Sequence, residues 1–185
     1  MTASSRISSI LRADPLRWHL LGVVEALNLP DCWIGAGFVR NAVWDHLHHR
    51  SIAPPDADVD VIWYDPYRTN AAEDRKFEAH LQALEPSITW SVKNQARMHG
   101  RNGDAPYASA IDAMRYWPET ATAVAARRCG SHGCDIAAPF GLDDLLDLVL
   151  RPTSRFRVEK RTIYEDRIRT KGWLEYWPLL TRAEG

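Results

Sequence analysis

The sequence has few cysteines, little net charge and no long apolar run. Three cysteines among 185 residues are an odd number, too few for a disulfide framework, so we expect the protein in the cytoplasm. No apolar stretch reaches the roughly 18 residues of a membrane span, and the N-terminus lacks a signal-peptide core, so no membrane association is expected. With 23 basic and 24 acidic residues, the chain has no overall basic field of the kind found in general nucleic-acid-binding proteins.

What is present is an alternation of strand and helix patterns. Short apolar runs over 32–36, 59–64 and 88–93 predict buried strands, and helical spacing of apolar residues predicts helices over 38–48 and 71–84. Two further strands are expected, and this order predicts an α/β (α+β) fold with a small mixed sheet flanked by helices. Whether the first two strands run parallel or antiparallel stays open. The two further strands cover 120–126 and 134–138.

A single domain over 1–185 is expected, with a core over about 14–152 and a C-terminal helical extension over about 153–185. A long loop over 95–107 contains two glycines and a proline, and loops of this length are often functional. Helices are expected over 108–116, 142–150 and 153–171. Residues 151–171 carry eight basic and three acidic side chains, which favours a solvated helix, with RNA binding as the open alternative.

The first motif that could bind a ligand is the glycine-containing turn over 35–41, between a predicted strand and a predicted helix. Gly35 and Gly37 would let a phosphate approach the backbone, and the helix N-terminus offers free N–H groups. The dinucleotide-binding fingerprint is excluded because Arg40 stands where its third glycine would be. Arg40 and Asn41 could bind phosphate, or could lock the helix to the next strand.

The second motif is a pair of aspartates entering the second predicted strand. Asp58 and Asp60 are two residues apart, so on a strand they share one face. Neighbouring carboxylates repel one another, and a divalent cation removes that repulsion. Mg²⁺ favours one or two carboxylates together with substrate phosphates. The pair therefore predicts a metal site, with a solvated acidic strand entry as the alternative.

Together the two motifs resemble the nucleotidyltransferase superfamily of DNA polymerase β and the tRNA CCA-adding enzymes. A closer resemblance is to its bacterial nucleotidyltransferase-like branch, and it spans roughly 32–152. The strings that carry it cover 33–41, 58–61, 90–99, 117–122 and 138–145. Two departures are visible: Ala36 takes the first place of the turn, where two glycines or Gly-Ser are usual, and the third predicted strand offers Lys93 and Asn94 where an acid is usual.

The resemblance implies transfer of a nucleoside monophosphate from an NTP to an acceptor hydroxyl by a two-metal mechanism. It implies that Asp58 and Asp60 hold Mg²⁺, or Mn²⁺ in its place, and that the acceptor is a small molecule, a protein or RNA. Asp135 is the expected third catalytic acid, beside the pair, with Asn94 as the competing candidate. The alternative function is a nucleotide- or protein-binding module without catalysis. Nucleotide binding falls to Gly35, Gly37, Arg40, Asn41 and Lys93.

Overall fold

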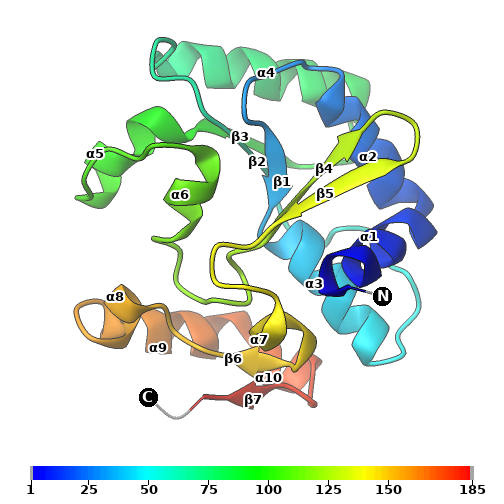
Figure 1. The fold of residues 1–185 in the computed structure, drawn as a ribbon, viewed down its shortest axis with the longest axis vertical. Helices are drawn as coiled ribbons and strands as arrows, with labels where there is room; N and C mark the ends of the chain where they lie inside the picture. Colours follow the sequence, from blue (N-terminus) through cyan, green and yellow to red (C-terminus); the bar gives the residue numbers. More distant parts are fainter. Residues whose placement is uncertain (1, 184–185) are drawn as a thin grey trace.

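A computed structural model describes residues 2–183, and Met1, Glu184 and Gly185 lie outside it. A five-stranded sheet occupies the centre, with helices on both faces (Figure 1). The strands are β1 (Trp33–Gly35), β2 (Val59–Trp63), β3 (Trp90–Asn94), β4 (Ala125–Cys129), β5 (Gly133–Ala137), β6 (Val149–Leu150) and β7 (Thr181–Arg182). The helices are α1 (Ala3–Ala13), α2 (Pro15–Glu25), α3 (Gly37–Leu47), α4 (Ala71–Leu84), η1 (Gln95–Arg97), α5 (Met98–Asn102), α6 (Ala110–Met114), α7 (Asp143–Leu146), α8 (Ser154–Arg157), α9 (Arg161–Lys171) and α10 (Trp173–Tyr176).

The sheet is mixed, as the sequence predicts, with strand order β3-β2-β1-β4-β5. β1 pairs antiparallel with both β2 and β4, which settles the question that the sequence leaves open. β2 and β3 run parallel because α4 carries the chain across between them. β4 and β5 form an antiparallel hairpin at the edge of the sheet.

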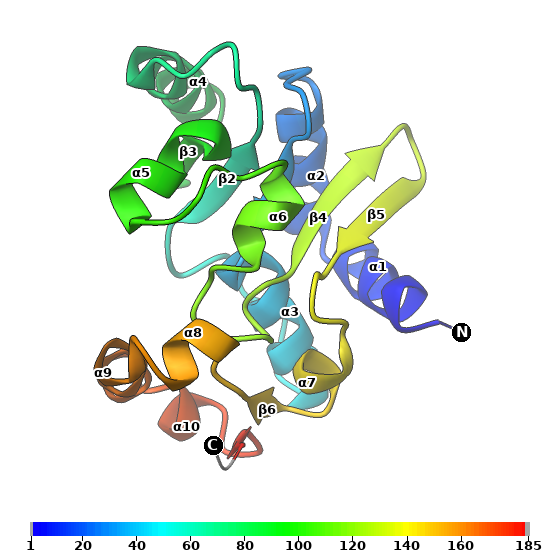
Figure 2. The same cartoon turned by 60° about the vertical axis from the view of Figure 1, so that its left-hand side comes forward.

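The two faces of the sheet are covered differently. Ile34, Val61 and Val92 belong to the main apolar core, together with buried residues of α1 to α4. The opposite face carries Trp33 and Ile62, which pack with residues of α6 in a smaller apolar cluster. Figure 2 shows α6 beside the sheet. Because strand residues alternate between faces, Asp60 lies on the same face as Ile62.

The C-terminal segment packs against α3 rather than against the sheet (Figure 1). Trp173 and Trp177 meet Trp44 of α3 edge to face, with ring centroids 5.8 and 5.1 Å apart. The Trp177 indole N–H donates a hydrogen bond to Asp45 at 2.8 Å. Within residues 2–183, no helix combines the length and apolar character needed to cross a bilayer.

Three sequence expectations for the connections were wrong. The strand expected over 120–126 begins only at Ala125, because the preceding residues pair with the segment after β6: Thr120 N–H donates to Arg151 O, and Thr153 N–H donates to Pro118 O. The stretch expected as a loop over 95–107 contains the helices η1 and α5. The helix expected over 142–150 ends at Leu146, and Leu148 adopts a left-handed φ of 59°, which a continuing helix excludes.

Two helices also differ from the sequence prediction. The helix expected over 153–171 is divided into α8 and α9 by a turn at Val158, whose side chain is 73% exposed. α1 was not predicted, yet the Thr2 side chain caps its N-terminus and both Ile7 and Leu11 are fully buried. Ala3, Ile7, Ile10 and Leu11 recur at helical spacing, so the pattern that predicts this helix is present in the sequence and was missed.

Candidate functional site: an acidic pair beside a helix N-terminus

The turn from β1 into α3 lies directly beside the acidic strand. Gly35 of β1 is the register partner of Asp60 on β2. Ala36 follows with φ 54° and ψ −125°, and it caps α3 through its carbonyl, which accepts from Val39 N–H and Arg40 N–H. Within residues 2–183, the N–H groups of Gly37 and Phe38 have no hydrogen-bond partner. Unpaired N–H groups and the helix dipole favour an anion at this point.

The two glycines of the turn have different surroundings. A Cβ on Gly35 would come within 2.8 Å of the Trp117 ring, so close packing alone explains that glycine. A Cβ on Gly37 would lie 3.5 Å from Arg40 Nη2 and 3.7 Å from the Asn41 amide, which is ordinary contact. Gly37 is therefore the residue that leaves the open end of α3 accessible, next to two polar side chains.

Asp58 and Asp60 are near enough for the charge of one to act on the other. Asp60 is half-buried within β2, and Asp58 is exposed one residue before the strand begins. Burial raises the pKa of Asp60, and the negative charge of Asp58 raises it further. Hydrogen bonding to Ser91 and the charges of Arg167 and Lys93 act in the opposite direction without cancelling the rise. Asp60 is thus a carboxylate without sufficient positive charge around it, which is the condition that a bound cation would relieve.

Arg40 and Asn41 join α3 to the loop that precedes the acidic strand. The Asn41 amide donates to Asp56 at 3.2 Å, and its carbonyl accepts from Arg40 Nη2 at 2.8 Å. Arg40 Nη1 donates to Thr122 Oγ1 at 2.8 Å, and only 5% of Arg40 is exposed. Burial lowers the pKa of Arg40 to about 10. Each nitrogen of the Arg40 guanidinium thus donates to a protein acceptor, which favours the helix-locking alternative over direct phosphate contact.

β3 contributes a serine, not an acid, beside the pair. Ser91 is the register partner of Asp60, and Lys93 is the partner of Ile62 on the same face. Lys93 Nζ lies 3.4 Å from Glu78 of α4, so its charge is shared with that carboxylate. Asn94 pairs with Trp63, which places it on the opposite face. Its amide is also consumed by bonds to backbone groups of residues 65, 68 and 96, so Asn94 cannot supply a third metal ligand here.

The expected position of Asp135 was wrong. Asp135 lies on β5, and both β1 and β4 separate that strand from β2. Its carboxylate accepts from Arg127 Nε and Nη2, each at 3.0 Å, and half of its side chain is exposed. Asp135 is on the same face of the sheet as Asp60, but its hairpin forms the edge of the sheet that is remote from β2. No group of three or more His, Cys, Asp or Glu within residues 2–183 is arranged to hold a metal.

A buried cluster that the sequence did not predict joins the C-terminal segment to the start of α3. Glu119 is fully buried and accepts from Arg167 Nε of α9 at 2.8 Å. The guanidinium carbons of Arg40 and Arg167 lie 4.2 and 5.2 Å from the ring centroid of Trp173. The basic stretch over 151–171 was the available signal, but nothing in it distinguishes Arg167 from its seven basic neighbours.

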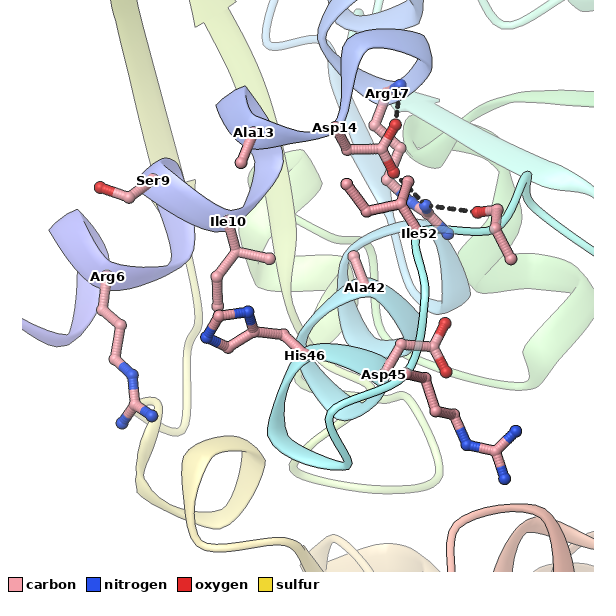
Figure 3. Close-up of a pocket in the computed structure, with 12 residues that line it drawn as sticks. Arg6, Ser9, Ile10, Ala13, Asp14, Arg17, Ala42, Asp45, His46 and Ile52 are labelled. Atoms are coloured by element: carbon pink, nitrogen blue, oxygen red, sulfur yellow. Dashed lines mark hydrogen bonds and ion pairs between the residues drawn. The ribbon is translucent and has the colours of Figure 1, made fainter.

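Two cavities lie near α3, and they differ in their relation to the site. One, of about 570 Å³, lies between the start of α3, the loop at Asp56 and the α9–α10 junction, and Arg40, Asn41, Lys171 and Trp173 are among its lining residues. The other, of about 370 Å³, is enclosed by α1, the later turns of α3 and residues 50–53 (Figure 3). The second cavity contains none of the predicted nucleotide- or metal-binding residues.

Comparison with known proteins places this arrangement in a defined class. A family model described as "Nucleotidyltransferase" matches residues 22–182, so the chain belongs to that nucleotidyltransferase family. An NMR structure said to reveal "a CCA-adding enzyme head domain" is 34% identical with a TM-score of 0.84, and the match covers 98% of this chain and 96% of that one. No protein with a curated description matches the chain.

More distant structures share the fold. A CCA-adding enzyme in complex with CTP has a TM-score of 0.62 at 15% identity, covering 96% of this chain and 43% of the enzyme. A CCA-adding enzyme in complex with ATP has a TM-score of 0.53 at 16% identity, covering 97% of this chain and 42% of the enzyme. This chain therefore corresponds to less than half of those enzymes.

Proposed function

We propose that the protein transfers a nucleoside monophosphate from an NTP to an acceptor hydroxyl. The acceptor oxygen forms a bond to the α-phosphorus, the bond from that phosphorus to the bridging oxygen of the β-phosphate breaks, and pyrophosphate leaves. The hydroxyl proton passes to solvent or to a nearby carboxylate. Membership of a nucleotidyltransferase family supports the reaction class. The observation that carries the assignment to this site is the acidic pair next to the open end of α3.

The donor set fits a divalent cation. Asp58 and Asp60 offer oxygen ligands from two neighbouring carboxylates, and the raised pKa of Asp60 reflects burial and an uncompensated like charge. Mg²⁺ is commonly held by one or two carboxylates plus substrate phosphates and water. Bound there, Mg²⁺ or Mn²⁺ would supply charge stabilisation for the phosphates and would acidify a coordinated hydroxyl.

The chain's own residues have separate tasks in this proposal. The N–H groups of Gly37 and Phe38 bind phosphate oxygens at the start of α3. Arg40 and Asn41 hold that turn in place and keep a positive charge behind it. Lys93 contributes charge from the neighbouring strand, since it lowers the pKa of Asp60. The acceptor is a small molecule, a protein or RNA, and the chain is expected in the cytoplasm.

The experiment is Mg²⁺-dependent binding of each NTP, measured by calorimetry, followed by detection of released pyrophosphate with candidate acceptors. We expect binding that requires Mg²⁺ and that Asp58→Asn abolishes while the thermal unfolding midpoint is retained. An NTP affinity that changes neither on removal of Mg²⁺ nor on Asp58→Asn would contradict the assignment.

A specific observation favours a second candidate, which is nucleotide binding without transfer. Ser91 stands beside Asp60 where a third acid would complete the carboxylate set, and Asp135 lies at the far edge of the sheet. A serine hydroxyl is a weak ligand and no base at neutral pH. Mg²⁺-dependent NTP binding with no pyrophosphate released for any acceptor would favour this candidate. Transfer that survives Asp135→Ala would show that Asp135 is not the third acid.

A further inference from the structure

Arg167 of α9 stands out because its guanidinium is only partly used by the protein. Its Nε donates to Glu119 at 2.8 Å, and within residues 2–183 neither terminal nitrogen has a hydrogen-bond partner. Its side chain is 30% exposed, whereas Glu119 is fully buried. The buried carboxylate therefore holds the guanidinium through Nε and leaves the N–H groups of the two terminal nitrogens free to donate.

Arg167 is linked to the start of α3 by the ring of Trp173, which contacts both Arg167 and Arg40. Arg167 and Arg40 both lie against Trp173, at 5.2 and 4.2 Å from its centroid. Arg40 Nη2 in turn lies 3.5 Å from where a Cβ on Gly37 would be. Trp173 therefore connects Arg167 to the start of α3.

The charge balance of this cluster is incomplete. Glu119 forms an ion pair with Arg167 and acts on Arg40 only through its charge, and the second oxygen of Glu119 has no hydrogen-bond partner. The charge of Arg167 lowers the pKa of Arg40, as expected for two cations held close together. One turn further along α9, Lys171 lines the 570 Å³ cavity together with Arg40 and Asn41. An anion in this region would be attracted by the positive charges of Arg40, Arg167 and Lys171.

We propose that Arg167 binds the phosphate chain of the NTP through its terminal nitrogens and that Glu119 positions it. This inference rests on the proposed function and adds a residue of the C-terminal segment to the same site. A guanidinium forms paired hydrogen bonds to phosphate oxygens, which suits a side chain whose Nε edge is already fixed. Arg40 is less suited to this role because each of its three nitrogens already donates a hydrogen bond within the protein.

The test compares Arg167→Gln with Arg167→Lys and with Arg169→Gln, a matched control on the same helix whose side chain is 77% exposed. The probes are ATP, CTP and inorganic tripolyphosphate, each titrated with Mg²⁺ by calorimetry. We expect Arg167→Gln to weaken all three by about tenfold or more, as loss of a charge-assisted contact does. Arg167→Lys should fall between the wild type and Arg167→Gln, and Arg169→Gln should change affinity by less than about twofold.

A second variant separates binding from folding. Arg167→Gln leaves the buried Glu119 without its ion-pair partner, so the unfolding midpoint should fall. Adding Glu119→Gln should recover the midpoint without recovering tripolyphosphate affinity. Wild-type affinity in Arg167→Gln or in the double variant, or an equal loss in Arg169→Gln, would overturn the inference. The proposed function would still stand if NTP binding depended on Asp58. A wild-type protein that binds no NTP would overturn both.

Discussion

Asp60 and Asp135 lie on the same face of one sheet, yet their surroundings are opposite. Asp60 is half-buried beside Asp58, and its pKa is raised by burial and then by that neighbouring charge. Asp135 is exposed at the hairpin, and hydrogen bonds from Cys129 and Arg127 lower its pKa. The hairpin acid is already satisfied by protein donors, whereas the acid beside the glycine turn is not. This difference is the reason for proposing the cation site at Asp60 and not at Asp135.

The largest expected effect is on nucleotide binding. Asp60→Asn removes a carboxylate ligand, and loss of outer-shell partners alone typically weakens metal sites by about 10–100-fold. We therefore expect Mg²⁺-dependent NTP affinity to fall at least about 100-fold. Asp135→Asn, measured in parallel by calorimetry, should leave it within about twofold. Equal losses in the two variants would remove the distinction between the two acids.

Substitutions of Gly35 and Gly37, the two glycines beside the acidic pair, should have different effects on stability and on NTP binding. Gly35→Ala would bring a Cβ to 2.8 Å from Trp117, and such overpacking costs about 1–3 kcal/mol in unfolding free energy. Gly37→Ala meets only ordinary contacts, so its midpoint in a urea titration should stay near that of the wild type. Gly37→Val should instead weaken NTP affinity by more than about tenfold, because its branches crowd the phosphate approach. A destabilised Gly37→Ala with a stable Gly35→Ala would contradict the packing described.

The pH dependence of stability should have opposite signs at the two acids. Because the pKa of Asp60 is raised in the folded state, ionisation of Asp60 lowers the stability of the protein. Asp60→Asn should therefore stabilise the protein near pH 7. This gain should vanish below the unfolded-state pKa, which is near 4. A lowered folded-state pKa means that Asp135 adds stability above that same value, and the contribution is lost as pH falls through the folded pKa. Asp135→Asn should therefore destabilise slightly at pH 7, by under about 1 kcal/mol for an exposed pair.

Thermal unfolding of both variants between pH 3 and pH 8 measures these differences. The matched change of Asp to Asn keeps side-chain volume nearly constant, so charge is the main variable. A stabilising Asp135→Asn at pH 7, or an Asp60→Asn whose gain grows as the pH falls, would reverse the assigned environments.

The smallest expected effect is on a thiol at the hairpin. The exposed Cys129 donates to Asp135 Oδ2 at 3.2 Å, and burial followed by that carboxylate raises the pKa of the thiol. Asp135→Asn leaves Arg127 without its anionic partner, which favours the thiolate. Reaction of Cys129 with a disulfide reagent at pH 8 should become about two- to threefold faster, a change of under one pKa unit. Asp60→Asn serves as the control and should leave the rate unchanged.

Much of the fold and part of the site follow from local sequence patterns. The spacing of Asp58 and Asp60 and the glycine turn are features of neighbouring residues, so both can be recognised in the sequence alone. The antiparallel direction of β1 relative to β2 and the place of β5 in the strand order depend on contacts between residues far apart in the sequence. The predicted position of Asp135 was wrong for that reason. The alternation of residues along a strand predicts which face a side chain is on, but not how far across the sheet its strand lies.

The contribution of the C-terminal segment could not be predicted for a related reason. Arg167 and Glu119 are 48 positions apart, and only the packing of Trp173 and Trp177 against α3 brings α9 to the start of that helix. In the sequence, Arg167 is one of many basic residues in a polar stretch. Its distinction is that its partner is a buried carboxylate, and burial of a lone glutamate is not encoded in a local pattern.

The most direct measurement is a crystal structure of the protein with Mg²⁺ and a non-hydrolysable NTP. We predict density for a cation between the carboxylates of Asp58 and Asp60, and phosphate oxygens within hydrogen-bond distance of the Gly37 and Phe38 N–H groups. Asp135 should keep its ion pair with Arg127 in that structure. A triphosphate bound away from the start of α3, or a cation held at Asp135 and not at the pair, would contradict the central claim.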